Sequence, residues 1–384
     1  MVKAKYEEEK QKAKLQLQNV TAVSVTSDMW TSIKMDAYLA LSCHYIDENT
    51  CLKSTVLGVV HFPEKHTAVN LATNMIACGK ALRLRHAICV AHTLNLIVKK
   101  SLDLTAVLSA IRTKARRLGY FWSSTTAKEK LALIQEQMGK PKLKLIQEVE
   151  TRWNSTFQML QRLGEQWEPV GAALGGLVSD IPALTSEEYT NVTGCLSILS
   201  PFHKATVELS EEKRVSGSKV IPLLKMIEKM LQEETMRSSN PLARELGEHL
   251  IKLLREKLHT LQSSSIMSLP TLLDPRFKIG NKLWSHLDAT VMASRTKHNV
   301  TADATVEVQR YLLEPNIGRT DDPLLYWERQ KCIYPNLYKL AIVHPSLTCS
   351  CERLFSKAGE VISKKRNRLN PSTVEQILFL NKNP

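Results

Sequence analysis

An acidic residue follows a strand-like pattern near the start of the chain, in the stretch SVTSDMW at residues 24–30. Polar and apolar residues alternate from Val23 to Thr26, which predicts a β-strand over residues 20–27 that ends just before Asp28. A carboxylate at the end of a strand is either a loop residue or one ligand of a metal site, since hard carboxylate oxygens suit Mg²⁺. A metal site would require further carboxylates elsewhere in the chain.

Cys89 and His92 form a C-x-x-H pair, a spacing that occurs in zinc sites. Zinc requires three or four protein ligands, and no second pair stands at a useful spacing, because Cys349 and Cys351 are too close together. We therefore expect Cys89 and His92 to be buried core residues. The sequence also lacks a glycine-rich phosphate loop and a G-x-S-x-G nucleophile motif.

Basic residues gather in two stretches of the chain. Residues 78–119 carry nine Lys or Arg and one acid, Asp103, and residues 364–368 read KKRNR. Each stretch is either a solvated face or a surface that contacts phosphates, and the second could also serve nuclear import. The chain has 52 Lys and Arg against 38 Asp and Glu, a net charge of +14 that favours polyanionic partners.

The stretch TRWNST at residues 151–156 precedes a helical pattern. Its structural interpretation makes Trp153 a core anchor and Asn154 or Ser155 the helix cap. A second interpretation is that Arg152 and Trp153 hold a displaced nucleotide by stacking.

Composition is that of a soluble globular protein with room for two or three domains: 384 residues, 43% hydrophobic and 23% charged. We find no apolar run long enough to span a membrane, and the charged N-terminus lacks the apolar centre of a signal peptide. The eight cysteines are scattered, which predicts reduced thiols in the cytosol or nucleus.

A short β-rich part and a long helical part would position these residues. Residues 3–18 predict a polar helix, either a connector or a frayed end, and residues 20–27, 37–45 and 51–62 predict three antiparallel strands. From Thr93 onward the pattern is helical, with further helices opening at Ser186 and spanning 219–234 and 241–261. One face of the first long helix is apolar: Leu94, Ile97, Val98, Leu104, Leu108 and Ile111.

The chain ends in two amphipathic helices, one before and one after the Asn370-Pro371 pair. Their apolar side chains could form core or a partner surface, and the residue pattern leaves both open. The residues concerned are Leu354, Phe355, Ala358, Val361 and Ile362 in the first helix, and Val374, Ile377, Leu378 and Leu380 in the second.

Eight motifs occur in a fixed order: SDMWTS, FPEKHTAVNLA, NMIACGKAL, the C-x-x-H pair with TLNLIV, TRWNST, LDPRFK, DPLLYWERQ, and CERLFSKAG with RNRLNP and ILFLN. They span most of residues 20–383 and resemble the transposase body of hAT-type DNA transposons, in particular the BED-finger proteins domesticated from them. The resemblance implies an α/β fold with a ribonuclease-H-like core, interrupted by a large all-α insertion and followed by a C-terminal helical dimerisation region.

The resemblance also implies an order of domains and a catalytic carboxylate set. The implied segments are a connector helix at 1–19, the first part of the core at 20–99, the helical insertion at 100–340, and the rest of the core with the dimerisation region at 341–384. Three carboxylates in this family hold two divalent cations for DNA strand cleavage and transfer. By motif position, Asp28 is the first of them and Glu352 the last.

The chain departs from the family at the second carboxylate. The family places an aspartate in a T-D-N stretch before the N-M that begins a helix, whereas here His66-Thr67 leads almost directly to Asn74-Met75. About thirty residues, the size of a β-α-β unit, are missing, and no acid lies between Glu64 and Asp103. Two carboxylates without the third are not expected to hold two metal ions.

The departure also removes a central strand of the implied sheet. Unpaired backbone groups cost roughly 1–3 kcal/mol each when buried. Either the stretch HAICVAH at residues 86–92 pairs beside the first strand, which we expect, or the chain is a shortened product that folds poorly. The BED zinc finger that reads target DNA has no counterpart either, because the first residues contain no Cys-Cys-His-His set.

The first hypothesis is a catalytically inactive, transposon-derived nuclear protein that forms a homodimer and associates with DNA, in transcription regulation. Such a protein is expected to bind no cofactor and no small-molecule substrate, and not to associate with a membrane. Alternatives are an active Mg²⁺-dependent transposase, with Glu64 or Asp103 replacing the lost aspartate, and a protein-interaction scaffold that does not bind DNA. The expected DNA contacts are Arg83, Arg85, Lys364, Lys365, Arg366 and Arg368. The expected dimer residues are Leu354, Phe355, Val361, Ile362, Leu369, Val374, Ile377, Leu378 and Leu380.

Overall fold

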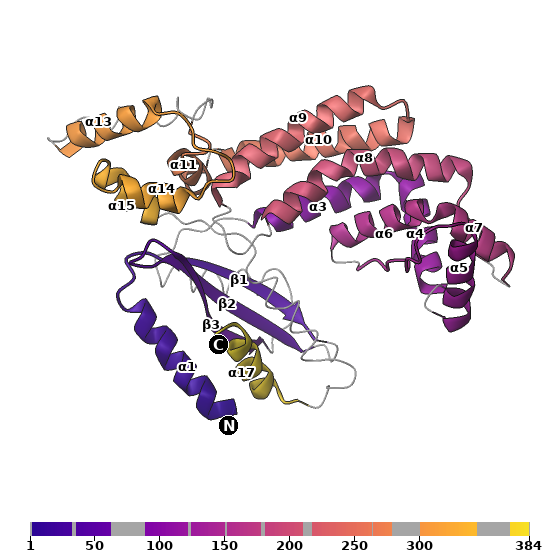
Figure 1. The fold of residues 1–384 in the computed structure, drawn as a ribbon, viewed down its shortest axis with the longest axis horizontal. Coiled ribbons are helices and arrows are strands. Elements are labelled where there is room, and N and C mark those ends of the chain that lie inside the picture. Colours follow the sequence, from indigo (N-terminus) through magenta and orange to yellow (C-terminus); the bar gives the residue numbers. More distant parts are fainter. Residues whose placement is uncertain are drawn as a thin grey trace. The chain divides into compact units, whose positions relative to one another are not determined.

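Figure 1 shows the computed structural model of the chain. The structure describes residues 2–32, 36–62, 89–121, 124–149, 152–177, 181–209, 217–262, 264–278, 300–343 and 369–383. The chain divides into two compact units, one of residues 1–89, 209–222 and 261–384 and the other of residues 90–208 and 223–260. This division differs from the expected domain limits, because residues 261–340 group with the sheet and not with the helical insertion.

The first unit contains an antiparallel sheet of three described strands in the order β1-β2-β3. These are β1 (Ser24–Thr31), β2 (Ala37–Ile46) and β3 (Leu52–Phe62). The three antiparallel strands predicted from alternation are therefore confirmed. β1 was expected to end before Asp28, but it continues to Thr31, since Trp30 and Thr31 are themselves good strand formers.

The hairpin between β2 and β3 has a special backbone conformation at its tip. Thr50 adopts a φ of 56°, a left-handed conformation that β-branched residues rarely adopt. Asp47 holds the turn, because its Oδ1 accepts hydrogen bonds from the backbone N–H groups of Asn49 at 3.1 Å and Cys51 at 2.8 Å. The Thr50 hydroxyl hydrogen-bonds Glu328 and Tyr338, so the tip is fixed by contacts outside the hairpin.

The stretch at residues 86–92 does not supply the expected strand where the structure describes it. Residues 86–88 lie outside the described residues, and the helix α3 (Val90–Leu104) begins at Val90. The reason is that Val90 and Ala91 continue the helical spacing of Leu94, Ile97 and Val98, and all five are buried on one side of α3.

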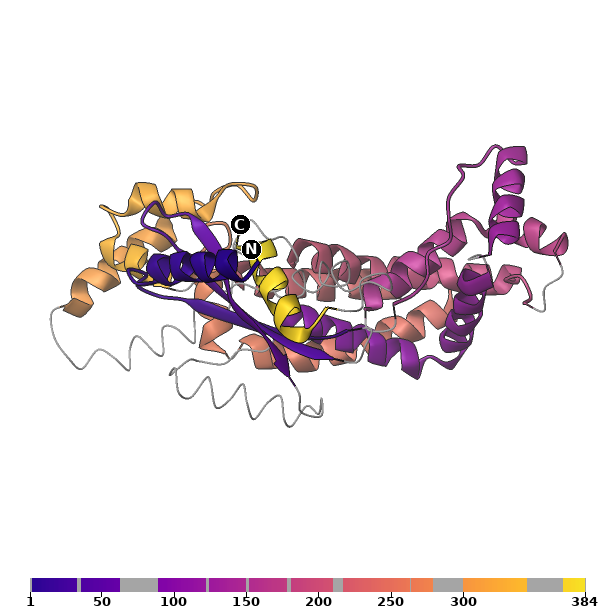
Figure 2. The ribbon, with the colours of Figure 1, turned by 90° about the horizontal axis from the view of Figure 1, so that it is seen from below.

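One face of the sheet is covered by the two terminal helices, α1 (Val2–Leu17) and α17 (Pro371–Lys382), as Figures 1 and 2 show. The Tyr6 ring of α1 packs edge-to-face on Phe379 of α17, with 4.9 Å between ring centroids. α1 is therefore a packed element rather than the expected connector or frayed end. The buried cluster beneath consists of Tyr38, Ala40, Val56, Val59, Val374, Leu378 and Phe379.

The first unit has a second core, built by short helices. Its buried residues are Leu273, Tyr311, Trp327, Tyr334 and Leu337. The elements are the 3-10 turn η1 (Gly217–Lys219) and the helices α11 (Ser265–Leu273), α13 (Val300–Leu313), α14 (Pro323–Gln330) and α15 (Pro335–Val343).

The second unit is helical in its described residues. The long helix expected from Thr93 is broken at Thr105, whose hydroxyl donates to the Ser101 carbonyl at 3.0 Å. Leu104 ends α3 at this break and is exposed, so it leaves the expected apolar face, while Leu108 is buried as expected. The helices after α3 are α4 (Ala106–Phe121), α5 (Thr125–Gln137), α6 (Trp153–Glu165), α7 (Trp167–Gly175), α8 (Ser186–Leu209), α9 (Val220–Arg237) and α10 (Pro241–Gln262).

The three later helices expected from the sequence are confirmed, and the start of α8 shows why. Thr185 and Glu188 form a capping box, in which each side chain accepts a hydrogen bond from the backbone N–H of the other. This reciprocal pair satisfies two donors that the first turn of a helix leaves unpaired.

Candidate functional site

Asp28 lies inside β1 and is half-buried. It stands opposite Ala40 of β2, so the two side chains lie on the same face of the sheet, the face that α17 covers at β3. Its Oδ1 accepts a hydrogen bond from the N–H of Met29 at 2.8 Å. Asp28 is therefore a strand residue on the core face of the sheet, not a loop residue.

The described residues do not fit a two-metal site. They contain no group of three or more His, Cys, Asp and Glu side chains that could hold an ion. Glu352, the expected last carboxylate, lies outside the described residues.

Cys89 and His92 are both exposed, which corrects the expectation that they are core residues. They flank Val90 and Ala91, which are the side chains that α3 turns inward. Elsewhere in the described chain Cys43 and Cys195 are buried, and burial raises the pKa of the Cys43 thiol to about 11. A thiol with a raised pKa carries little thiolate at neutral pH and is unreactive.

The six expected DNA contacts, Arg83, Arg85, Lys364, Lys365, Arg366 and Arg368, all lie outside the described residues. Other members of the first basic stretch are described, and several pair with acids of the same unit. Arg112 contacts Asp103, Arg116 contacts Glu148, and Lys114 contacts Glu188 at 2.7 Å. These three cations therefore have a structural role in the helical unit.

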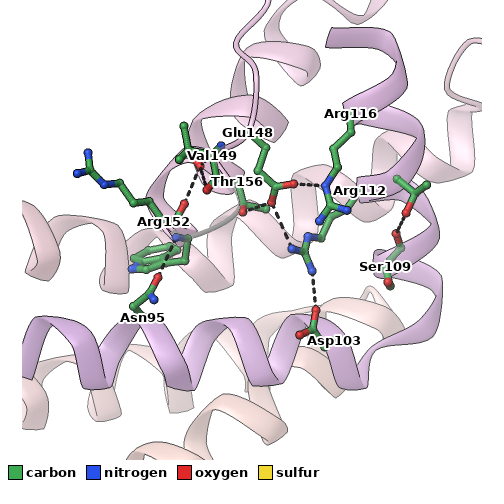
Figure 3. A network of polar contacts seen from close by, with 12 residues as sticks. Asn95, Asp103, Ser109, Arg112, Arg116, Glu148, Val149, Arg152 and Thr156 are labelled. Atoms are coloured by element: carbon green, nitrogen blue, oxygen red, sulfur yellow. Dashed lines mark hydrogen bonds and ion pairs between the residues drawn. The ribbon is translucent and has the colours of Figure 1, made fainter. Parts of the chain in front are cut away.

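Glu148 is the centre of this polar network, which Figure 3 shows from close by. Its carboxylate accepts hydrogen bonds from Arg112 Nη2 at 3.2 Å, from Arg116 Nε and from the Thr156 hydroxyl. Arg112 also donates from Nη1 to Asp103 Oδ1 at 2.9 Å. The network fastens the extended segment before α6 to two turns of α4.

The protonation of Glu148 depends on these partners. Burial of the side chain by itself would raise its pKa, but the hydrogen bonds from Thr156 and Arg116 and the charge of Arg112 outweigh burial. The net effect is a pKa below the ordinary value for glutamate, so Glu148 is ionised at neutral pH. No sequence pattern marked Glu148, because its partners are 8 to 36 residues away.

Trp153 is a core anchor, as expected, with 2% of its surface exposed. Its backbone N–H donates to Asn95 Oδ1 of α3 at 2.9 Å, and its ring packs against Phe157 and Phe202. A buried indole cannot stack on a nucleotide in this conformation. The cap of α6 is Arg152, which makes no side-chain cap hydrogen bond, so neither expected cap residue is used.

Ser155 acts on the preceding segment instead of capping the helix. Its hydroxyl accepts from the Val149 N–H at 2.7 Å and lies 2.6 Å from the Arg152 carbonyl. Figure 3 shows Arg152 directed away from the Glu148 carboxylate. The TRWNST stretch therefore joins α3, α6 and the Glu148 network through three different contacts.

The expected dimer residues that the structure describes lie on or just before α17. Val374 and Leu378 are buried in the core against the sheet of the same chain, and Leu369 packs on that core. The buried side chains of Val374 and Leu378 are therefore core residues of this chain in the structure. Leu369, Ile377 and Leu380 are half-buried, and their place in a dimer contact stays a prediction. Leu354, Phe355, Val361 and Ile362 lie outside the described residues.

The edge of β3 is bonded by side chains of the same C-terminal segment. Asn383 accepts from the Val56 N–H at 3.0 Å and donates to the Val56 carbonyl at 2.8 Å. Glu375 accepts from the His61 N–H. A strand edge with free backbone groups invites pairing with another chain, and these contacts block it at two positions.

Family models match three parts of the chain. Residues 26–108 match the ZBED1 RNase-like domain, residues 87–194 the ZBED1 RNase-like helical domain, and residues 307–384 the hAT family C-terminal dimerisation region. These matches support a hAT-derived, BED-type domesticated transposase. The resemblance inferred from the motifs is thereby confirmed.

Individual relatives of this chain carry three kinds of name. Zinc finger BED domain-containing protein 4 of Homo sapiens is 27% identical over 347 residues, which cover 77% of this chain and 29% of that protein. Putative AC transposase of Zea mays is 23% identical over 483 residues, covering 97% of this chain and 58% of its own length. Putative transcriptional regulator tpeD of Talaromyces stipitatus is 22% identical and covers 97% of this chain and 55% of its own length.

The chain thus spans less than two thirds of each of these relatives. The alignment with the maize protein covers 483 positions, more than the 384 residues of this chain, so the relative has residues within the matched span that have no counterpart here. Among the helices that the structure describes, none combines the length and apolar character needed to cross a membrane.

Proposed function

We propose that the chain is a catalytically inactive, transposon-derived nuclear protein that dimerises through its C-terminal region, associates with DNA and acts in transcription regulation. Its core is ribonuclease-H-like: β1, β2 and β3 lie in the part that matches an RNase-like domain, and the second unit begins in the part that matches its helical domain. The match to the dimerisation region supports the homodimer. Names of relatives, with both zinc finger proteins and a transcriptional regulator among them, support the regulatory role.

The observation that carries the proposed loss of catalysis is the missing second carboxylate. No acid lies between Glu64 and Asp103, and the longer alignment with the maize transposase is consistent with residues lost inside the matched span. Asp103 is a poor substitute, because its Oδ1 is bonded to Arg112 at 2.9 Å within the helical unit. The alternative of an active enzyme therefore lacks a third carboxylate that could join Asp28 and Glu352 in holding the metal ions.

A strand-cleavage assay tests this proposal. The purified chain is incubated with Mg²⁺ or Mn²⁺ and DNA that carries transposon terminal repeats, and nicked product is measured. We expect no nicking above a metal-only control. Metal-dependent nicking that disappears in both Asp28→Asn and Glu352→Gln would show that the chain is an active transposase.

DNA association is tested by the salt dependence of binding. Fluorescence anisotropy with a short random-sequence duplex should give a Kd that rises steeply with salt, because each phosphate contact releases a counterion. We expect Arg83→Gln with Arg85→Gln to reduce the slope of log K against log salt by roughly 2. The control Lys252→Gln with Lys257→Gln on α10 removes equal charge elsewhere, and an equal effect there would assign binding to net charge alone. Absence of binding at low salt would favour the scaffold alternative.

A further inference from the structure

The matched dimerisation region, residues 307–384, has two described parts with different surroundings. α17 is used within its own chain, since Val374, Leu378 and Phe379 are buried against the sheet and Asn383 and Glu375 bond the edge of β3. The second part, residues 307–343, contains α14, α15 and most of α13. Because α17 packs within its own chain, residues 307–343 are the better candidate for a dimer contact among the described residues.

The inner side of this part is held together by buried and partly buried hydrogen bonds. Glu307 of α13 is buried and accepts hydrogen bonds from the backbone N–H groups of Asn336 at 3.0 Å and Leu337 at 3.1 Å, at the start of α15. Glu314 accepts from the hydroxyls of Tyr326 and Tyr334, both at 2.6 Å. Glu307 of α13 and Glu314, which directly follows α13, thus hold α14 and α15 in place over the aromatic core.

The same part exposes large aliphatic side chains on its outer side. Ile333 is 56% exposed in the turn before α15, and Leu340 and Val343 are 37% and 40% exposed on α15 itself. Leu340 and Val343 are three residues apart and so lie on one side of the helix. Single exposed aliphatic residues are ordinary, but here two on α15 and one in the turn before it lie within the matched dimerisation region.

We infer that the α15 face, defined as Ile333, Leu340 and Val343, is the centre of the contact with a second copy of this chain. A symmetric dimer places the same face of both copies together, so apolar side chains meet apolar side chains. The exposed Lys339 on α15 and the ion pair of exposed Lys331 with half-buried Glu328 before it would form a polar rim. The inference rests on the proposed function, because it specifies where the proposed homodimer forms.

Sedimentation equilibrium of the full chain over a range of concentrations tests the α15 face. We expect the wild type to dimerise and Leu340→Glu to raise the dimer Kd at least about tenfold, because the buried charge is introduced twice by symmetry. The control Met236→Glu, at an exposed apolar residue of α9, should leave the Kd unchanged. Ile333→Lys, in the turn outside the helix, repeats the test if Leu340→Glu lowers the melting temperature.

Three outcomes separate the inference from the proposed function. A monomeric wild type at all concentrations would refute the proposed homodimer itself. A dimeric wild type whose Kd is unchanged in both Leu340→Glu and Ile333→Lys would refute only the α15 face. Loss of the dimer in Phe355→Glu, with Leu340→Glu still dimeric, would place the contact in the first C-terminal helix expected from the sequence and would also refute the α15 face.

Discussion

Glu148 shows how one buried carboxylate can organise a segment that has no regular structure. It joins Arg112 and Arg116 of α4 to Thr156 of α6, and its side chain is almost completely buried. Removing one member of a buried ion pair is costly, because the remaining charge stays buried without its partner.

We expect Glu148→Gln to lower the free energy of unfolding of the helical unit by roughly 3–5 kcal/mol. The substitution keeps the shape of the side chain but removes the counter-charge of Arg116 and leaves Arg112 with Asp103 alone. Urea unfolding followed by circular dichroism measures the change. The matched control is Glu136→Gln, which removes an exposed ion pair with Lys142 and should have almost no effect. Equal stability of both variants would show that the network contributes little.

The stabilisation by Glu148 should depend on pH in a defined direction. Its pKa in the folded chain is lower than 4.5, the ordinary value, so folding favours the ionised form. The stabilisation is complete above the unfolded pKa and is lost as pH falls through the folded pKa. The stability difference between wild type and Glu148→Gln should therefore be constant near pH 7 and shrink below about pH 4.5. A difference that grows with acidification would contradict this.

At the scale of elements, close contacts between backbone segments are made by small residues and by side-chain amides. Gly247 of α10 lies so near α9 that an added Cβ would stand 2.1 Å from the Thr235 hydroxyl oxygen. Asn383 bonds both backbone groups of Val56, which supplies β3 with the hydrogen bonds of a neighbouring strand at that position.

We expect Gly247→Ala to destabilise the α9–α10 pair, because the Thr235 side chain or the helices must shift to remove the clash. Gly171→Ala in α7, where an added Cβ meets nothing within 4 Å, should instead stabilise its helix by up to about 1 kcal/mol. Thermal unfolding distinguishes the two signs. Adding Thr235→Ala should rescue Gly247→Ala, and failure of this rescue would mean that the clash is not the cause.

Asn383→Ala should expose the edge of β3 locally. The Val56 amide loses its acceptor, so its hydrogen exchange should become faster while the amides at the centre of β2 keep their protection. Asn381→Ala, an exposed residue of α17, is the control and should leave exchange unchanged. Unchanged exchange at Val56 in Asn383→Ala would show that another group protects the edge.

At the scale of the whole molecule, local sequence patterns predicted helices and strands better than they predicted which residues contact one another. Alternation located the three strands, and helical patterns located α8, α9 and α10, because these signals lie within a few residues. The Glu148 network, the burial of Val374 and Leu378, and the packing of α1 on α17 depend on residues far apart in the chain. The motif order indicated the family correctly, but the exposure of Cys89 depended on which side α3 turns inward.

Removal of residues 371–384 should affect the two units differently. The sheet would lose the side chains of Val374, Leu378 and Phe379 from its core, so hydrogen exchange in β2 and β3 should accelerate strongly. Amides of α8 and α10 in the second unit should keep their protection in the same sample. Loss of protection in both units would show that they fold as one cooperative body.

The core of the sheet joins two ends of the chain that are made at different times. Val56 and Asn383 are 327 residues apart, so a ribosome that adds about 5–20 residues per second makes α17 roughly 20–60 seconds after β3. During that interval the apolar sheet face formed by Tyr38, Ala40, Val56 and Val59 has no α17 to cover it. This apolar surface is therefore prone to aggregation until α17 has been made. Termination of synthesis before residue 371 would release a chain in which α17 does not cover the sheet.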